Sequence, residues 1–155
     1  MTSTSLLLRQ LDQSFASHAW HGPNLKGSLR GLTPKQLLWR PEKNRHNIWE
    51  IAIHCAYWKY AVKRRITGEK RGSFPLQGSN WFAVHGGTPA DWRHDLKFVS
   101  QMHAELMSAV KKIKPTQLNK KSGKYTFADL IMGAASHDVY HAGQIQLLKR
   151  LQKKR

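Results

Sequence analysis

Apolar residues recur at three- and four-residue spacing through four long segments of the chain. This spacing places them on one face of an α-helix, so each segment is predicted to be helical. The predicted helices begin near Ser5, His46, Thr88 and Phe127, and they end near Phe15, Thr67, Ile113 and Leu151. Strand-like alternation is limited to a possible extended piece near Lys124 and Tyr125. The pattern predicts an all-α fold, a four-helix bundle.

Threonine, proline and glycine residues indicate where several helices begin and end. Thr33, Thr88 and Thr126 each stand immediately before a helical pattern, and proline follows the first two. A threonine N-cap with proline at the first helical position is a favoured start. Gly68 is predicted to cap the end of the second long helix. Residues 25–32 and the turn that starts at Thr33 are expected to form short helical pieces.

The second long helix is expected to bury one apolar face. Its predicted inward positions are Ile48, Ile51, Ala52, Cys55, Trp58 and Val62. Lys59, Lys63 and Arg64 are expected on its solvent side. Residues 68–87, which follow, form a long connection for a small bundle, and long ordered loops often cover sites. We expect this loop to pack down as a lid through its bulky residues, which are Phe74, Trp81, Phe82 and His85.

Length and cysteine content limit the organisation of the chain. The 155 residues contain no repeat or long linker, which predicts a single domain over 1–155. Cys55 is the only cysteine, so an internal disulfide and a cysteine-based zinc motif are both excluded. No apolar run approaches the ~18 residues of a membrane span, and the leucines before Arg9 are too few for a signal-peptide core. We expect a soluble, cytoplasmic protein.

The charge balance is strongly basic. Lysine and arginine number 26 and aspartate and glutamate 9, which gives a formal net charge of +17. Such an excess attracts polyanions at low salt, so nucleic acid is a possible partner. The basic residues are scattered, however, and no helix-turn-helix or interleaved basic and aromatic pattern accompanies them. Binding to nucleic acid is therefore expected to be non-specific, and a non-enzymatic nucleic-acid-binding protein is the alternative to an enzyme.

Three of the nine histidines form a candidate metal site. His137 and His141 are four residues apart in the segment Ala135–Leu151, so both imidazoles lie on one helical face. His54 lies in the middle of the second long helix, where the chain is apolar on most sides. Three imidazoles from facing helices, with one open position, are the ligand set of a catalytic zinc site. The alternative is that the spacing is accidental and these histidines are structural.

The other six histidines lie near helix ends, in loops or on mixed faces. We expect them to be surface residues or hydrogen-bonded groups without a ligand role: His18, His21, His46, His85, His94 and His103.

Two residues are placed to orient the ligand imidazoles. Glu50 precedes His54 by one turn, and Gln144 follows His141 by three residues. A carboxylate or amide beside a ligating imidazole fixes its tautomer. Glu50 could instead be a solvated carboxylate at a helix start. Glu50 and Tyr57 are also the candidates for a catalytic base or orienting group, although the sequence selects neither.

Three segments in the same order resemble the DinB/YfiT-like family of metal-dependent hydrolases and transferases. The first is AWHGPNLKGSLRGLTPKQLLWRP, similar to the family's first helix and following turn. The second is HNIWEIAIHCAYWKY, with a histidine ahead of an aromatic pair. The third and most specific is SHDVYHAGQIQLLKR, which is similar to the family's HxxxHxGQ segment.

The resemblance implies more than the residues alone. It implies an up-down-down-up four-helix bundle, a divalent ion such as zinc or nickel held by His54, His137 and His141, and a homodimer. Family members with assigned activity use low-molecular-weight thiols, which implies a small thiol-containing substrate. The basic balance departs from an ordinary member and would suit an anionic substrate. A family member that binds metal without catalysis is a further alternative.

Overall fold

The computed structural model describes residues 1–153, and helices dominate it. The long helices are α1 (Ser3–Phe15), α4 (Ile48–Thr67), α5 (Pro89–Lys111) and α6 (Phe127–Gln152). The short elements are α2 (Leu25–Ser28), α3 (Pro34–Leu38), the 3₁₀ turn η1 (Pro115–Gln117), and the strands β1 (Lys121–Ser122) and β2 (Tyr125–Thr126). The two strands pair antiparallel as a small hairpin. The predicted all-α class is confirmed.

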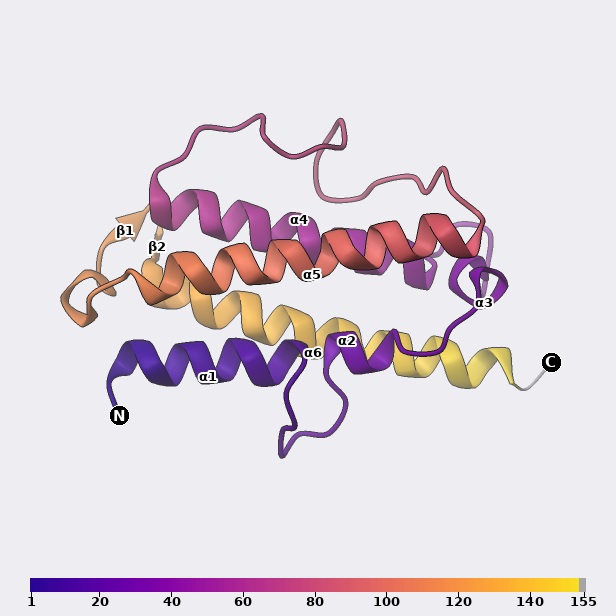
Figure 1. Cartoon of the computed structure of the whole chain (residues 1–155), viewed down its shortest axis with the longest axis horizontal. Helices are drawn as coiled ribbons and strands as arrows, with labels where there is room; N and C mark the ends of the chain where they lie inside the picture. Colours follow the sequence, from indigo (N-terminus) through magenta and orange to yellow (C-terminus); the bar gives the residue numbers. More distant parts are fainter. Residues whose placement is uncertain (154–155) are drawn as a thin grey trace.

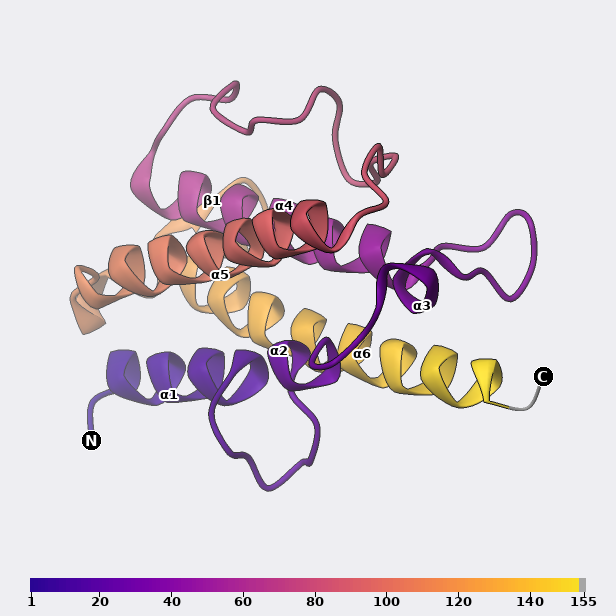
Figure 2. The same ribbon diagram turned by 45° about the vertical axis from the view of Figure 1, so that its right-hand side comes forward.

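The four long helices lie side by side, as Figures 1 and 2 show. In Figure 1, α1 and α6 run from left to right, whereas α4 and α5 run from right to left. α4 packs against α5 and α6, and α1 packs against α5 and α6. The parallel pair α4 and α5 needs a long connection, and residues 69–87 supply it along the outside of these helices (Figure 1).

The predicted helix caps are present. The side-chain oxygens of Thr33, Thr88 and Thr126 each accept a hydrogen bond from the backbone amide of the third helical residue. The side-chain oxygen of that third residue accepts a bond from the threonine's own amide. These reciprocal bonds satisfy amide groups that a helix start otherwise leaves without partners. Gly68 ends α4 with φ of 80°, in the left-handed region that favours glycine. The short helix α2 ends at Ser28, four residues earlier than the pattern suggested.

The burial of α4 corrects the sequence reading at two neighbouring positions. Trp58, predicted to face inward, is 38% exposed, whereas Lys59, predicted on the solvent side, is 1% exposed. Lys59 is tolerated inside because its ammonium donates to the buried carboxylate of Asp138 on α6. His103 also differs from expectation: it is buried and stacks on Phe15 at 4.0 Å.

The connection between α4 and α5 packs down as predicted. Phe82 is buried, and Phe74 and Trp81 are partly buried against the core. His85 instead points to solvent. The loop therefore covers part of α4, including the turn that carries His54.

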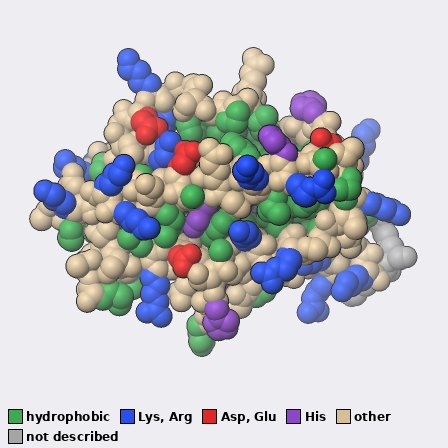
Figure 3. Space-filling view, viewed as in Figure 1, with side chains coloured by type: hydrophobic (Ala, Val, Ile, Leu, Met, Phe, Trp, Pro, Cys, Tyr) green, Lys and Arg blue, Asp and Glu red, His purple; other side chains and the backbone are tan. Residues whose placement is uncertain are grey.

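Two surface features bear on possible partners. No helix within residues 1–153 has the length and apolar character needed to cross a membrane. Lysine and arginine side chains are spread over the face seen in Figure 3, with other side chains between them.

Candidate metal centre

The structure brings His54, His137 and His141 together where α4 packs against α6. The Nε2 atom of His137 lies 3.0 Å from Nε2 of His54 and 3.0 Å from Nε2 of His141. The nitrogens that the three rings offer all lie within 4.8 Å of one another. His54 and His141 are buried, and His137 is partly buried. The i, i+4 spacing on α6 explains one pair, and the packing of α4 on α6 supplies the third ring.

The outer ring nitrogens of two histidines are held by acceptors. Nδ1 of His54 donates to the carbonyl oxygen of Asn80 at 2.8 Å. Nδ1 of His141 donates to Oε1 of Gln144 at 2.7 Å. A carbonyl oxygen can only accept, so these bonds place the proton on Nδ1 and leave a lone pair on Nε2 in the neutral imidazole. Both lone pairs then face His137.

Burial keeps these imidazoles neutral at physiological pH. Desolvation lowers the pKa of His54, that of His137 to about 3 and that of His141 to about 4. Repulsion from the neighbouring histidines and Lys59 lowers the pKa of His137 further. Metal ions bind imidazole through an unprotonated nitrogen, so a depressed pKa favours the ligand form.

The donor set fits a divalent transition metal ion. A neutral His137 carries at most one proton on Nε2, and that proton can serve only one of the two facing lone pairs. Mutual hydrogen bonds therefore cannot satisfy all three nitrogens, whereas a single cation could accept electron density from each. Imidazole nitrogens suit zinc, nickel, copper and iron.

A second group of possible donors shares His137. Cys55, His137 and Asp138 also offer atoms within 4.8 Å of one another. Burial raises the pKa of the Cys55 thiol, which opposes the thiolate that a metal requires. The Asp138 carboxylate already accepts a hydrogen bond from Lys59. These two residues are therefore poor ligands.

Comparison with protein families shows which family the chain belongs to. The family model described as the DinB superfamily matches residues 17–145. The chain belongs to the DinB superfamily. The resemblance seen in the sequence is thereby confirmed, and the buried three-histidine cluster fits a metal-binding member. No curated protein and no solved structure gives a significant match.

The loop between α4 and α5 supports the histidines of this DinB superfamily member. Trp81 stacks on His54 with ring centroids 3.8 Å apart, and its other face stacks on His46 at 3.5 Å. Asn80, whose carbonyl holds His54, has φ of 68°, and its side-chain oxygen accepts a bond from Trp58 Nε1 at 2.9 Å. Asparagine is among the few residues that tolerate this conformation. The loop thus fixes the ring plane and the tautomer of His54 together.

A cleft of about 590 Å³ opens beside the cluster. His46, Trp81 and Tyr140 line it together with all three clustered histidines. Three leucines of α6 also line it, Leu147, Leu148 and Leu151, and so do the charged residues Glu42 and Arg45. The cleft gives a small molecule access to the three-histidine cluster.

Of the two residues proposed from sequence to orient the ligand imidazoles, Gln144 contacts a cluster histidine and Glu50 does not. Gln144 lies beside His141, as described, and its amide nitrogen donates to the Tyr140 hydroxyl at 3.0 Å. Glu50 instead accepts two hydrogen bonds from Arg40 at 2.5 and 2.7 Å, and one each from His46 and the Asn47 backbone at 3.2 Å. It therefore completes the start of α4 and reaches His54 only through the stacked rings of His46 and Trp81.

Glu50 and Tyr57 do not reach the centre of the cluster. Burial alone would raise the pKa of Glu50, but the hydrogen bonds from Arg40 and its neighbours hold the pKa below its ordinary value. Such a carboxylate is a poor proton acceptor at neutral pH. Tyr57 packs in an aromatic group with Phe74 and Phe82 under the loop.

Sequence reasoning missed three contributors to the site: Asn80, His46 and Tyr140. Asn80 acts through its backbone carbonyl, a group that every residue has, so the residue type gives no indication of this role. His46 was set aside as a residue at a helix end, although its spacing of four from Glu50 could have indicated the observed contact. Tyr140 lies on the same face of α6 as Gln144 and is 63% exposed at the cleft.

Proposed function

We propose that His54, His137 and His141 bind one divalent transition metal ion and that the protein is a metal-dependent enzyme. The observation that carries the proposal is the convergence of three Nε2 atoms while the Nδ1 atoms of His54 and His141 are held from outside. This is the arrangement that ligating histidines adopt, because the outer bond fixes the ring and its tautomer. Zinc and nickel are the ions that we expect.

The bound ion would supply Lewis acidity, with which proteins activate a water or thiol nucleophile at neutral pH. The chain's own residues then have positioning roles. Gln144 and the Asn80 carbonyl orient two imidazoles, and Trp81 shields one face of His54 from water. The Tyr140 hydroxyl at the cleft is placed to orient a substrate group, which makes it a better candidate than Tyr57.

The reaction class that we propose is hydrolysis or thiol-dependent group transfer on a small molecule. Family membership and the open cleft beside the histidines support a small-molecule substrate. The net charge of +17 favours a substrate with negative charge, whereas Arg45 at the cleft is paired with Glu42 at 3.7 Å.

We also propose that the four long helices form an up-down-down-up bundle of the family type and that the protein assembles as a homodimer. The antiparallel course of α1 and α6 against α4 and α5 supports the first part. The second part rests on the family resemblance.

Metal analysis of protein purified without an affinity tag tests the proposal. We expect about one zinc or nickel ion per chain, and we expect His54→Ala, His137→Ala and His141→Ala each to lose it. His18→Ala is the matched control, because His18 is exposed and lies outside the cluster. Full metal content in the three cluster variants would refute the site.

A further inference from the structure

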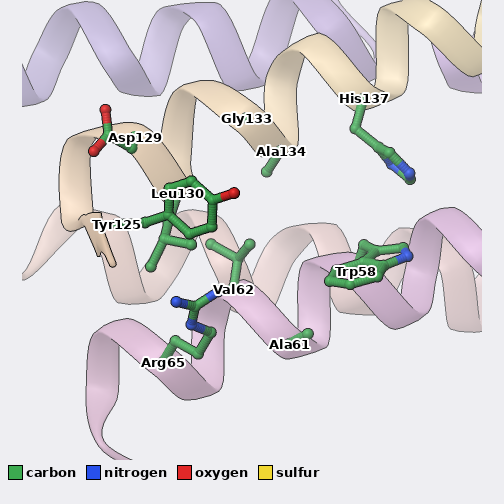
Figure 4. A pocket seen from close by; sticks show the side chains of 10 residues that line it. All are labelled: Trp58, Ala61, Val62, Arg65, Tyr125, Asp129, Leu130, Gly133, Ala134 and His137. Atoms are coloured by element: carbon green, nitrogen blue, oxygen red, sulfur yellow. The ribbon is translucent and has the colours of Figure 1, made fainter. Parts of the chain in front are cut away.

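A second cavity begins at His137 and runs along the groove between α4 and α6, away from the cleft described above. Its volume is about 320 Å³, and Figure 4 shows the side chains that line it. The middle of this α4/α6 groove is apolar, because its walls are Ala61, Val62, Leu130 and Ala134. All four side chains are at least nine-tenths buried, so they form a fixed surface.

The two ends of the α4/α6 groove differ in chemistry. His137 and Trp58 lie together at one end, and Arg65 and Tyr125 lie together at the other (Figure 4). Seven residues separate Trp58 from Arg65 on α4, which corresponds to about 10 Å along a helix. A ligand of moderate length could therefore touch the arginine while its other end reaches the three-histidine cluster.

The far end of the groove carries an arginine, Arg65, that forms no ion pair with the described residues. Arg65 is fixed there because its guanidinium donates to the backbone oxygen of Ser122 and, at 3.3 Å, to the Ser122 hydroxyl. Arg65 and Lys124 lie over the Tyr125 ring at 5.7 and 5.1 Å from its centroid. No carboxylate in residues 1–153 forms an ion pair with Arg65.

One carboxylate, that of Asp129, also lines the groove. Its Oδ2 atom is used at the start of α6, where it accepts bonds from the Thr126 amide at 2.8 Å and the Thr126 hydroxyl at 2.6 Å. The guanidinium of Arg65 therefore has no carboxylate partner in the described part of the chain, and the one carboxylate in the lining is engaged at the start of α6, which leaves the guanidinium available to an anion.

We propose that the α4/α6 groove binds the hydrocarbon body of the substrate, an amphipathic organic anion with its charged end at Arg65 and its other end at the three-histidine site. The reaction at the histidines rests on the proposed function, whereas occupancy of the groove does not. A fixed guanidinium gives the ligand its orientation, and the apolar walls give it affinity.

Gly133 makes the groove open to a direct test. A Cβ atom built at Gly133 meets no atom within 4 Å, so a larger side chain there would extend into the groove without a clash at its base. Gly143 is also on α6 and equally free at Cβ, but it does not line the groove. Leucine favours a helix more than glycine does, so both positions should accept it.

The experiment measures binding of octanoate and of its neutral amide, octanamide, to the full chain by calorimetry with EDTA present. We expect octanoate to bind at least tenfold more tightly than octanamide. Gly133→Leu should weaken octanoate binding at least tenfold, and Gly143→Leu should change it less than twofold. Arg65→Met should abolish the preference for octanoate, whereas Arg9→Met, which removes an exposed charge from α1, should keep it.

Equal binding by the two glycine variants, a preference for octanoate that survives Arg65→Met, or no octanoate binding by the unaltered chain would each overturn the inference. Thermal unfolding of every variant, with Gly133→Met as a second blocking substitution, separates a filled groove from a damaged fold. Because the assay contains no metal, failure of the metal analysis would refute the proposed function and leave the groove result intact.

Discussion

Two polar clusters are buried side by side between α4 and α6, and they differ in how their polar atoms are compensated for the loss of water. Lys59 and Asp138 are each 1% exposed in their side chains and form an ion pair with each other. His54, His137 and His141, which adjoin them, direct three nitrogens at one point and cannot satisfy one another. The first cluster compensates its own charge inside the protein. The second leaves nitrogen lone pairs that the three rings cannot all satisfy, could hold a metal ion, and borders on two cavities.

This contrast separates a structural polar group from a ligand site more reliably than burial alone. Both clusters carry shifted pKa values of the same origin: burial raises the pKa of Asp138 to about 6 and lowers that of His137 to about 3. What differs is charge compensation: Lys59 neutralises Asp138, although Oδ2 of that carboxylate has no hydrogen-bond partner among the described residues, whereas the three histidines offer one another only lone pairs and at most one proton. Removing one partner should therefore destabilise the first cluster, and adding a metal should stabilise only the second.

The largest effect is expected from breaking the ion pair. Lys59→Met leaves the Asp138 carboxylate buried without its partner, which should lower the free energy of unfolding by ~3–5 kcal/mol. The double variant Lys59→Met/Asp138→Leu should recover most of this loss, because no charge then remains buried. Urea unfolding in EDTA measures both, and a single variant as stable as the unaltered chain would contradict a structural role for the pair.

The free energy of unfolding should depend on pH in opposite directions for the histidines and for Asp138. An unfolded imidazole binds a proton near pH 6.5, whereas folded His137 and His141 do so only near pH 3 and 4. Between these values the unfolded chain holds more protons, so the free energy of unfolding falls as pH falls, by up to ~1.4 kcal/mol per pH unit for each histidine.

The folded pKa of Asp138 is raised above its unfolded value, so this residue contributes in the opposite sense. It adds stability as pH falls from about 6 toward its ordinary value. In metal-free protein, urea midpoints from pH 7 to 4 should therefore fall steeply for the unaltered chain and less steeply for His137→Phe/His141→Phe. Identical slopes would show that these histidines are not buried in neutral form.

A smaller effect is expected from the residue that orients His141. Gln144→Ala removes the acceptor of Nδ1, and loss of such a partner typically weakens metal affinity 10–100-fold. Gln144→Glu keeps an acceptor and should retain most of the affinity. Competition with a chromophoric chelator measures the change. Unaltered affinity in Gln144→Ala would remove Gln144 from the site.

The smallest effect is expected on the affinity for nucleic acid, which should not change when the three histidines are replaced. The charge of +17 predicts salt-sensitive binding to DNA that disappears near physiological salt and is the same with or without the three histidines. Fluorescence anisotropy with a DNA duplex from 50 to 200 mM salt checks this. Tight binding at 200 mM salt would favour the non-enzymatic alternative over the metal site.

The helices were predictable because their signals are local. Thr33, Thr88 and Thr126 cap helices through residues only three positions away. The histidine cluster was also within reach, since His137 and His141 share a face and His54 lies in an apolar segment. The family resemblance then rested on the same residues.

The sequence-based predictions failed where the burial or role of a residue depends on a partner far away in the chain. Lys59 is buried because Asp138 lies opposite it, 79 positions away in the chain, and helical periodicity contains no information about that pairing. Asn80 holds His54 through its backbone, so its role depends on the course of the loop. The α4/α6 groove likewise arises from packing between helices, so the position of Gly133 in its lining could not be predicted from the sequence.

Anomalous diffraction from crystals soaked in zinc and measured at the zinc edge tests the central claim most directly. The account predicts one strong peak per chain, in contact with the Nε2 atoms of His54, His137 and His141, and no peak at Lys59 and Asp138. The absence of a peak among the three histidines, or a peak held by Cys55 and Asp138 instead, would contradict it.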